Sequence, residues 1–148
     1  MDEAADPIVD HQGLEVIDLD ECWRLIDQSP VGRIAFIEAG EPTVFPVNHT
    51  TVGRRIVFRT ARGAALHQAL NDRPIAFEVD DFDVDTMTGW SVLVRGTATI
   101  APDLEDEPVD LVPWADSIDR NDWVAVIGSE VTGRRIIAHR GSESASSD

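Results

Sequence analysis

Two residue types are absent from this 148-residue chain, and a third occurs only once. There is no lysine, so all twelve basic side chains are arginine. This excludes Schiff-base chemistry, a lysine nucleophile and the lysine of a P-loop. Tyrosine is absent too, and the single Cys22 has no second cysteine for an internal disulfide. Cys22 falls in the apolar stripe of an expected helix, where we expect it to pack rather than react.

No apolar run approaches the roughly 18 residues that span a bilayer, and the acidic start MDEAADPIVD lacks the pattern of a signal peptide. The formal net charge is −16, which repels nucleic acid and anionic membranes. We therefore expect a cytoplasmic protein with neither of these as a partner.

The composition is that of one ordinary folded domain, with 43% hydrophobic and 27% charged residues. Residues 1–12 and 141–148 are rich in small, polar and acidic residues, and we expect both segments to be disordered. The folded domain is expected to span residues 13–140.

Short strand patterns dominate this domain. GRIAFIE, TVFPVNHTTV, RIVFRT, PIAFEVDDF, GWSVLVRGTATI, DWVAVIGSEV and RRIIAHR alternate or are apolar, and turns separate them at regular spacing. Helices are expected after the N-cap Asp18 and within GAALHQALNDRP. Such a pattern favours a closed or nearly closed antiparallel β-barrel over an alternating α/β fold.

Four arginines lie within nine residues of this otherwise acidic chain, at positions 54, 55, 59 and 62. They precede an expected helix, and a helix N-terminus with neighbouring guanidinium groups can hold a phosphate. A hairpin that carries arginines for solubility would have the same composition. The residues alone leave both interpretations open.

The other polar clusters point to no metal site. Asp81, Asp83 and Asp85 alternate, but an EF-hand loop from Asp81 would need a glycine where Thr86 stands. The four histidines lack metal-ligand spacing. Trp90 fits either core packing or stacking on a planar ligand.

The order of these segments resembles the pyridoxamine 5'-phosphate oxidase-like, FMN-binding split-barrel family. The resemblance runs through SPVGRIAFIEAGEPTVFPVNH, RIVFRTARGAALHQAL, RPIAFEVDDFD, TGWSVLVRGTATI and WVAVIGSEVTGRRI, which cover roughly residues 14–138. It implies a six- to seven-stranded antiparallel split barrel with two or three short helices. It also implies a homodimer with its cofactor sites at the interface.

The resemblance further implies a site for FMN. The segment FPVNH would run along the flavin ring, FRTARGAAL would hold the phosphate, and the start of GWS would reach the ring, often from the partner subunit. The cofactor-binding residues expected on this ground are Pro46, Val47, Asn48, Arg59, Thr60, Arg62, Ala65, Leu66, Trp90 and Ser91.

Two departures narrow the expected activity. The family usually has a phosphate-binding lysine where this chain has Ala65, and the arginine-rich substrate motif of the true oxidases is missing. We therefore expect a flavin-dependent oxidoreductase that transfers electrons or hydride to a small-molecule acceptor, and not a true pyridoxamine phosphate oxidase. No residue is assigned as catalytic, although His49 and His67 are candidates for proton delivery.

Two alternatives stay open. One is a reductase that uses a deazaflavin, for whose acidic tail Arg54 and Arg55 offer positive charge. The other is a module that binds or stores a flavin or haem without turnover.

Overall fold

The computed structural model describes residues 8–10, 13–60, 66, 73–106 and 122–137. In these residues the chain forms eight strands, one α-helix and one short 3-10 helix. The elements in chain order are β1 (Glu15–Ile17), α1 (Leu19–Gln28), β2 (Val31–Glu38), β3 (Glu41–Asn48), β4 (Thr50–Val52), β5 (Arg55–Thr60), β6 (Pro74–Asp83), β7 (Thr88–Ile100), η1 (Pro102–Asp106) and β8 (Asp122–Ile136).

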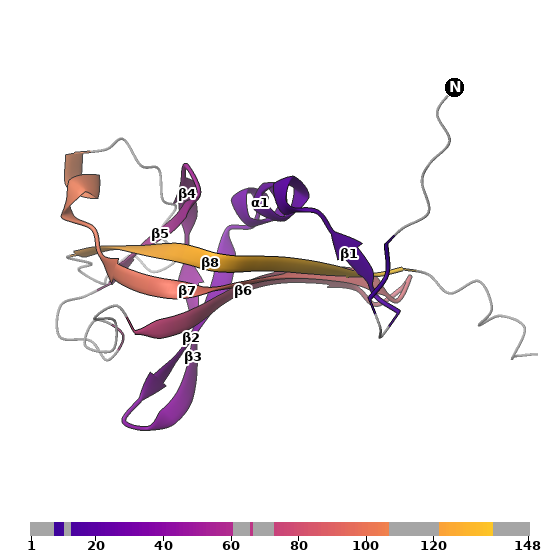
Figure 1. The fold of residues 1–148 in the computed structure, drawn as a ribbon, viewed down its shortest axis with the longest axis horizontal. Coiled ribbons are helices and arrows are strands. Elements are labelled where there is room, and N and C mark those ends of the chain that lie inside the picture. Colours follow the sequence, from indigo (N-terminus) through magenta and orange to yellow (C-terminus); the bar gives the residue numbers. More distant parts are fainter. Residues whose placement is uncertain (1–7, 11–12, 61–65, 67–72, 107–121, 138–148) are drawn as a thin grey trace, which may run out of the picture.

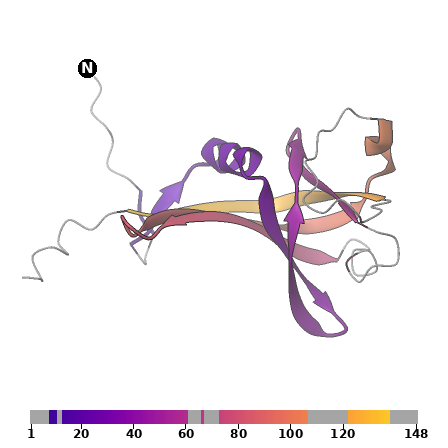
Figure 2. The ribbon, with the colours of Figure 1, turned by 180° about the vertical axis from the view of Figure 1, so that it is seen from behind.

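One antiparallel sheet contains all of these strands. Its order is β3-β2-β6-β7-β8-β5-β4, and β1 pairs with β8 beside this path. Figure 1 shows α1 over one side of the sheet, while the β2–β3 hairpin crosses the long strands and projects from the other side. The view from behind in Figure 2 shows the same arrangement of α1 and the β2–β3 hairpin about the sheet. The prediction of a mostly β, antiparallel split barrel is confirmed.

A single residue joins the two edges of this sheet. β3 forms one edge and β4 the other, yet only His49 separates them in the chain. The edges must therefore meet at this corner, which curls the sheet. The His49 ring is buried there, with Nε2 3.1 Å from the carbonyl oxygen of Ile26 and an edge-on contact to Phe77 at 4.9 Å between ring centroids.

The two faces of the sheet differ in chemistry. The face toward α1 carries the main core, which includes Ile34, Phe58, Phe77 and Val92. Because side chains alternate along a strand, their neighbours in sequence point to the opposite side. We call this opposite side the outer face.

Helix α1 begins and packs as its sequence indicates. Asp18 Oδ1 accepts a hydrogen bond from Glu21 N at 2.9 Å, and Cys22, Leu25 and Ile26 are buried in the core. β8 passes close beneath the helix at Gly133, where an added Cβ would lie 2.6 Å from Cys22 Sγ. The absence of a side chain at residue 133 thus lets helix and sheet approach each other.

Two strand boundaries differ from the sequence prediction. The expected strand DWVAVIGSEV and the first residues of RRIIAHR form one strand, β8, which ends at Ile136, because Gly133 stays in register with Val92 instead of making a turn. The last three residues of RRIIAHR lie outside the described residues. The expected strand TVFPVNHTTV is divided at His49 between the two sheet edges. The segment GAALHQALNDRP, in which a second helix is predicted, falls mostly outside the described residues. Its Leu66 is buried in the core, and its last residue, Pro74, begins β6.

None of the helices in the described part of the chain is long and apolar enough to cross a membrane.

Burial lowers the pKa of His49 below its usual 6.5, which predicts acid sensitivity at the corner. The unfolded chain binds more protons at this residue than the folded chain does. The contribution of His49 to the free energy of unfolding is therefore fully present above about pH 6.5 and decreases as the pH drops below that value. The substitution His49→Gln removes this pH-dependent contribution to the free energy of unfolding. The difference in unfolding free energy between wild type and variant, measured by urea titration, should therefore grow from about pH 5 to pH 8. A difference that stays constant with pH would contradict this.

Candidate functional site

Two arginines of β5 stand together on the outer face. Arg55 and Arg59 are four residues apart on one strand, so their side chains emerge on the same side. The guanidinium of Arg59 lies 4.8 Å from the centre of the Trp123 ring and 3.1 Å from Glu105 Oε1. Arg55 lies 3.3 Å from Asp103 Oδ2. Both guanidinium groups are therefore held by an aromatic or acidic neighbour and remain partly exposed.

The helix η1 supplies these two carboxylates. It is anchored by Leu104, which is buried with Val57, Trp123 and Ala125 in a small second cluster on the outer face. This anchoring fixes Asp103 and Glu105 beside the two arginines. An anion that binds here must share the guanidinium groups with these carboxylates or displace them.

The four clustered arginines of the sequence do not form one group. Arg54 points to the other side of the hairpin, where its guanidinium lies 5.4 Å from the Trp23 ring centre and 2.9 Å from Asp20 Oδ1. Arg62 and Ala65 lie outside the described residues. Among the described members of the cluster, Arg55 and Arg59 alone share the outer face.

Thr60 and Leu66 are both buried, with 3% and 7% of their surface exposed. Thr60 ends β5 and points to the core side, opposite Arg59. In the sequence Thr60 directly precedes residues 61–65, which are outside the described residues.

The corner at His49 brings the expected ring segment toward these arginines. Only His49 separates Asn48 from Thr50, and Thr50 pairs with Val57, two residues before Arg59. Pro46 and Asn48 face outward at the end of β3, whereas Val47 is buried on the core side. Two segments far apart in β-sheet order therefore meet where the barrel closes.

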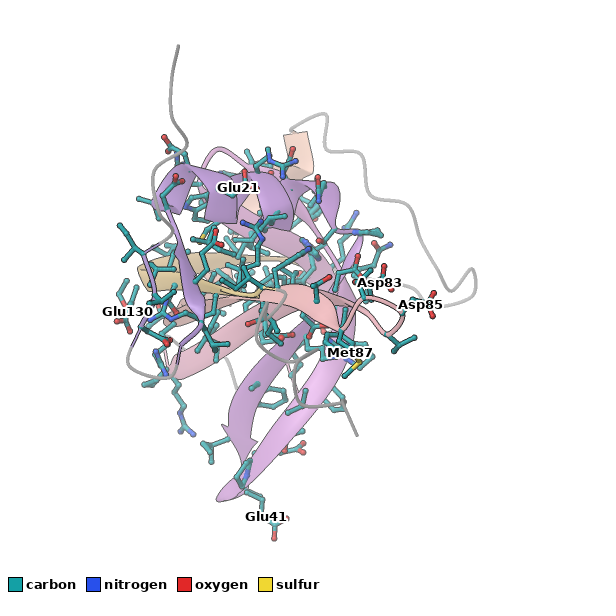
Figure 3. All side chains as sticks on the ribbon, turned by 90° about the vertical axis from the view of Figure 1, so that its right-hand side faces the viewer. Glu21, Glu41, Asp83, Asp85, Met87 and Glu130 are labelled. Atoms are coloured by element: carbon teal, nitrogen blue, oxygen red, sulfur yellow. The ribbon has the colours of Figure 1, made fainter. Side chains whose placement is uncertain are left out.

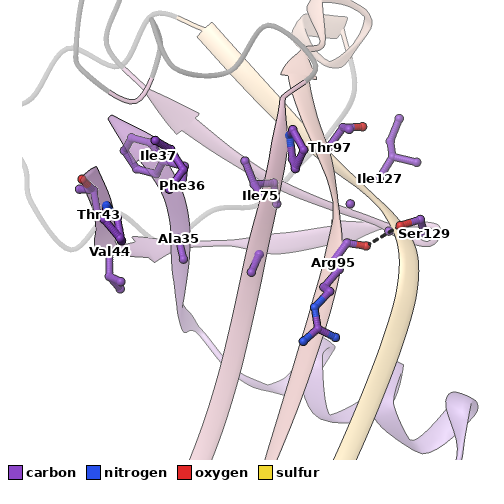
Figure 4. Close-up of a pocket in the computed structure, with 15 residues that line it drawn as sticks. Ala35, Phe36, Ile37, Thr43, Val44, Ile75, Arg95, Thr97, Ile127 and Ser129 are labelled. Carbon is purple, nitrogen blue, oxygen red and sulfur yellow. Dashed lines mark hydrogen bonds between the residues drawn. The ribbon is translucent and has the colours of Figure 1, made fainter. Parts of the chain in front are cut away.

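A hollow of about 600 Å³ opens on the same face. Figure 4 shows its lining, in which Ser129 Oγ donates to the Arg95 carbonyl oxygen at 3.1 Å. Most of the lining is apolar, and Val44 and Ile127 are more than half exposed. The hollow is lined by Ala35, Phe36, Ile37, Pro42, Thr43, Val44, Pro74, Ile75, Ala76, Arg95, Gly96, Thr97, Ile127, Gly128 and Ser129.

Trp90 and Ser91 lie toward the other end of the sheet. Trp90 packs against the core, while Ser91 points outward beside Asp80. Both line a second cavity of about 260 Å³, together with Glu78 and Arg134. Along β7, Ser91 is six residues, or about 20 Å, from Thr97 in the hollow.

A carboxyl pair in the second cavity was missed by the sequence analysis. Glu78 and Asp80 alternate on β6, and Arg33 Nη1 donates to both, at 3.1 Å and 3.0 Å. Burial raises the pKa of Glu78 to about 7, with Asp80 adding to the effect and Arg33 opposing it. The alternation in FEVDD was the available signal, but its partner Arg33 lies 45 residues away in the chain.

The acidic cluster of the β6–β7 hairpin and the histidines considered for proton delivery are placed as follows. Asp83 and Asp85 lie at the tip of the β6–β7 hairpin, well apart from Glu41 at the tip of β2–β3 (Figure 3). The part of the chain that the structure describes holds no group of three metal-ligating side chains. His49 is on the core side and not in the outer-face cavities, and His67 lies outside the described residues.

Comparison with known proteins identifies the family. The model of the pyridoxamine 5'-phosphate oxidase family matches residues 18–135. The chain belongs to this family. It is 36% identical over 130 residues to the uncharacterized protein Rv0080 of Mycobacterium tuberculosis, covering 82% of this chain and 85% of that one.

Several solved structures have a fold similar to that of this member of the family. An FAD binding protein from Mycobacterium smegmatis is 35% identical, with a TM-score of 0.70, covering 81% of this chain and 96% of that one. A conserved protein of unknown function from Corynebacterium diphtheriae is 26% identical, with a TM-score of 0.66, covering 84% and 98%.

Glu105 should compete with anions for Arg59. Replacing it by Gln removes the negative charge but keeps the side-chain size, and exposed ion pairs of this kind are worth about 0.2–1 kcal/mol. We expect Glu105→Gln to bind pyrophosphate roughly two- to fivefold more tightly by isothermal titration calorimetry. Glu130→Gln is the control, since it breaks the Arg95 pair on a different strand. Equal affinities in both variants would show that Glu105 does not compete.

Proposed function

We propose that this member of the pyridoxamine 5'-phosphate oxidase family is a flavin-binding oxidoreductase that acts as a dimer. One observation carries the proposal: the outward-facing Arg55 and Arg59 lie beside the closing corner at which Pro46 and Asn48 also face outward. The likeness to an FAD binding protein at 35% identity supports a flavin as the ligand.

The two arginines of β5 suit the phosphate group of a flavin cofactor. Guanidinium groups are planar, permanently charged forks that suit phosphate oxygens. The guanidinium of Arg59 already packs on the Trp123 ring, so the side chain loses less conformational entropy when an anion binds. The competing carboxylates of η1 are exposed, so displacing them costs little.

The exposed edge strand β3 suits the ring of a flavin cofactor. Among the described residues β3 pairs with β2 alone, so one row of its backbone groups has no strand partner there. Along Pro46–Asn48 these groups can hydrogen-bond the polar edge of a flavin ring. FMN and FAD share this ring and the first phosphate, and we propose FMN as the form bound, with FAD and a deazaflavin as the forms to test against it.

The flavin, when bound, supplies the redox chemistry. The chain's own residues would bind and orient it: Arg55 and Arg59 would hold the phosphate, and the end of β3 would support one edge of the ring. The substrate is proposed to be a small-molecule acceptor, because the outer-face cavities are of small-molecule size.

The exposed apolar hollow supports the proposed dimer. Val44 is 58% exposed and Ile37 and Ile127 are each 51% exposed on one face, which is unusual for a face that meets only water. We propose that a second copy covers the hollow. Ser91 and Trp90, which lie about 20 Å away along β7, would then serve the site of the other copy.

Flavin titration tests the cofactor and its phosphate site together. We expect FMN fluorescence to be quenched on binding, and Arg59→Ala to weaken the affinity about ten- to a hundredfold, since a charge-assisted hydrogen bond is worth about 1.5–3 kcal/mol. Arg54→Ala is the matched control, because its guanidinium lies on the other side of the hairpin.

The same titration with FAD and with a deazaflavin ranks the three forms. An affinity that Arg54→Ala reduces as much as Arg59→Ala would contradict the phosphate site. An absence of binding for all three forms would contradict the flavin proposal as a whole.

The association state tests the covered hollow. Sedimentation equilibrium of the wild type should give twice the chain mass of 16.2 kDa. Val44→Asp places an uncompensated charge in the hollow and should give the monomer mass at micromolar concentration. Leu19→Asp, at a similarly exposed site on the helix side, should remain dimeric. A dimer that survives Val44→Asp would place the interface elsewhere.

A further inference from the structure

The carboxyl pair Glu78–Asp80 lies on the outer face between Pro46, in the segment proposed to support the flavin ring, and Ser91, which is proposed to serve the site of the other copy. On the outer face the sheet register aligns Pro46 with Arg33 and Arg33 with Glu78, across β3, β2 and β6. Along the next row of the same face, Asp80 pairs with Ser91 of β7. Glu78 is thus two strand spacings, or about 10 Å, from the ring-supporting strand.

The surroundings of Glu78 suit a group that exchanges a proton. Its side chain is 31% exposed, so water reaches it, yet it also lines the second cavity. Arg33 Nη1 is shared by both carboxyl groups and can offset one negative charge, not two. The pair is therefore able to carry one proton near neutral pH, as its raised pKa indicates.

The charged groups around the pair come from each neighbouring strand. They are Arg33 on β2, Asp80 and Asp81 on β6, and Arg134 on β8, whose Nε donates to Asp10 at 2.9 Å. β7 contributes the neutral Ser91 and Leu93 opposite the pair. Because Arg134 already has a carboxylate partner, Arg33 is the main cation that acts on Glu78.

We propose that Glu78 is the proton-exchanging residue of the flavin site, and that Asp80 and Arg33 hold it in this role. The proposal rests on the flavin-binding function given above. If negative charge rises at the flavin site, the proton affinity of Glu78 would rise with it. The carboxylate would then take up one proton from water in the second cavity and release it when the charge falls again, so Glu78 ends unchanged.

Carboxyl titration in the flavin-loaded full-length protein tests this. With ¹³C-labelled glutamate, one carboxyl resonance should titrate near pH 7 and be absent from Glu78→Gln. Reducing the bound flavin with dithionite should raise its midpoint by about 0.3–1 pH unit, the effect of one charge at 10 Å. Asp80→Asn should lower the midpoint, because it removes the neighbouring carboxylate. Glu41→Gln, at a distant hairpin tip, is the matched control and should leave the resonance unchanged.

The outcomes separate this proposal from the function on which it rests. Flavin that binds to the wild type while the Glu78 midpoint stays the same in the oxidised and reduced states would overturn the role of Glu78 alone. Failure of any flavin to bind would overturn both, even where the resonance near pH 7 is seen. The proposal is supported if the carboxyl midpoint of the wild type shifts between the oxidised and reduced flavin states, and if Glu78→Gln shows neither the resonance nor the shift.

Discussion

The closure of the sheet at His49 is the constraint on which the rest of the structure depends. One residue carries the chain from the β3 edge to the β4 edge, so the sheet has to curl until these edges meet. The buried imidazole fixes this corner to the end of α1 through Ile26 and to the sheet through Phe77. The same corner brings the end of β3 to the arginines of β5, so the fold and the candidate site share one origin.

Charge on the outer face is arranged in pairs rather than as one positive basin. The arginines of β5 face carboxylates of η1, and Arg33 faces Glu78 and Asp80. Such pairing lets a chain with a net charge of −16 keep local anion-binding groups in position without a ligand. It also makes the carboxylates a part of any binding equilibrium, since a bound anion must compete with them.

Local patterns predicted the elements well where neighbours in sequence decide the structure. The N-cap of Asp18 and the apolar stripe of α1 both depend on a few adjacent residues. Long-range pairing was harder to predict. The extension of β8 past Gly133 depends on β7 as a partner and on the close approach of Cys22, which the strand's own sequence does not encode.

The sequence by itself determined the strand-rich pattern, the family resemblance and the residue types that can hold an anionic cofactor. The tertiary structure decided which of them act together. It separated Arg54 from Arg55, placed Thr60 and Arg59 on opposite sides of β5, and joined Arg33 to Glu78. The physical reason is that strand alternation sets the face of each side chain, whereas only the sheet register and the curl at His49 set its neighbours.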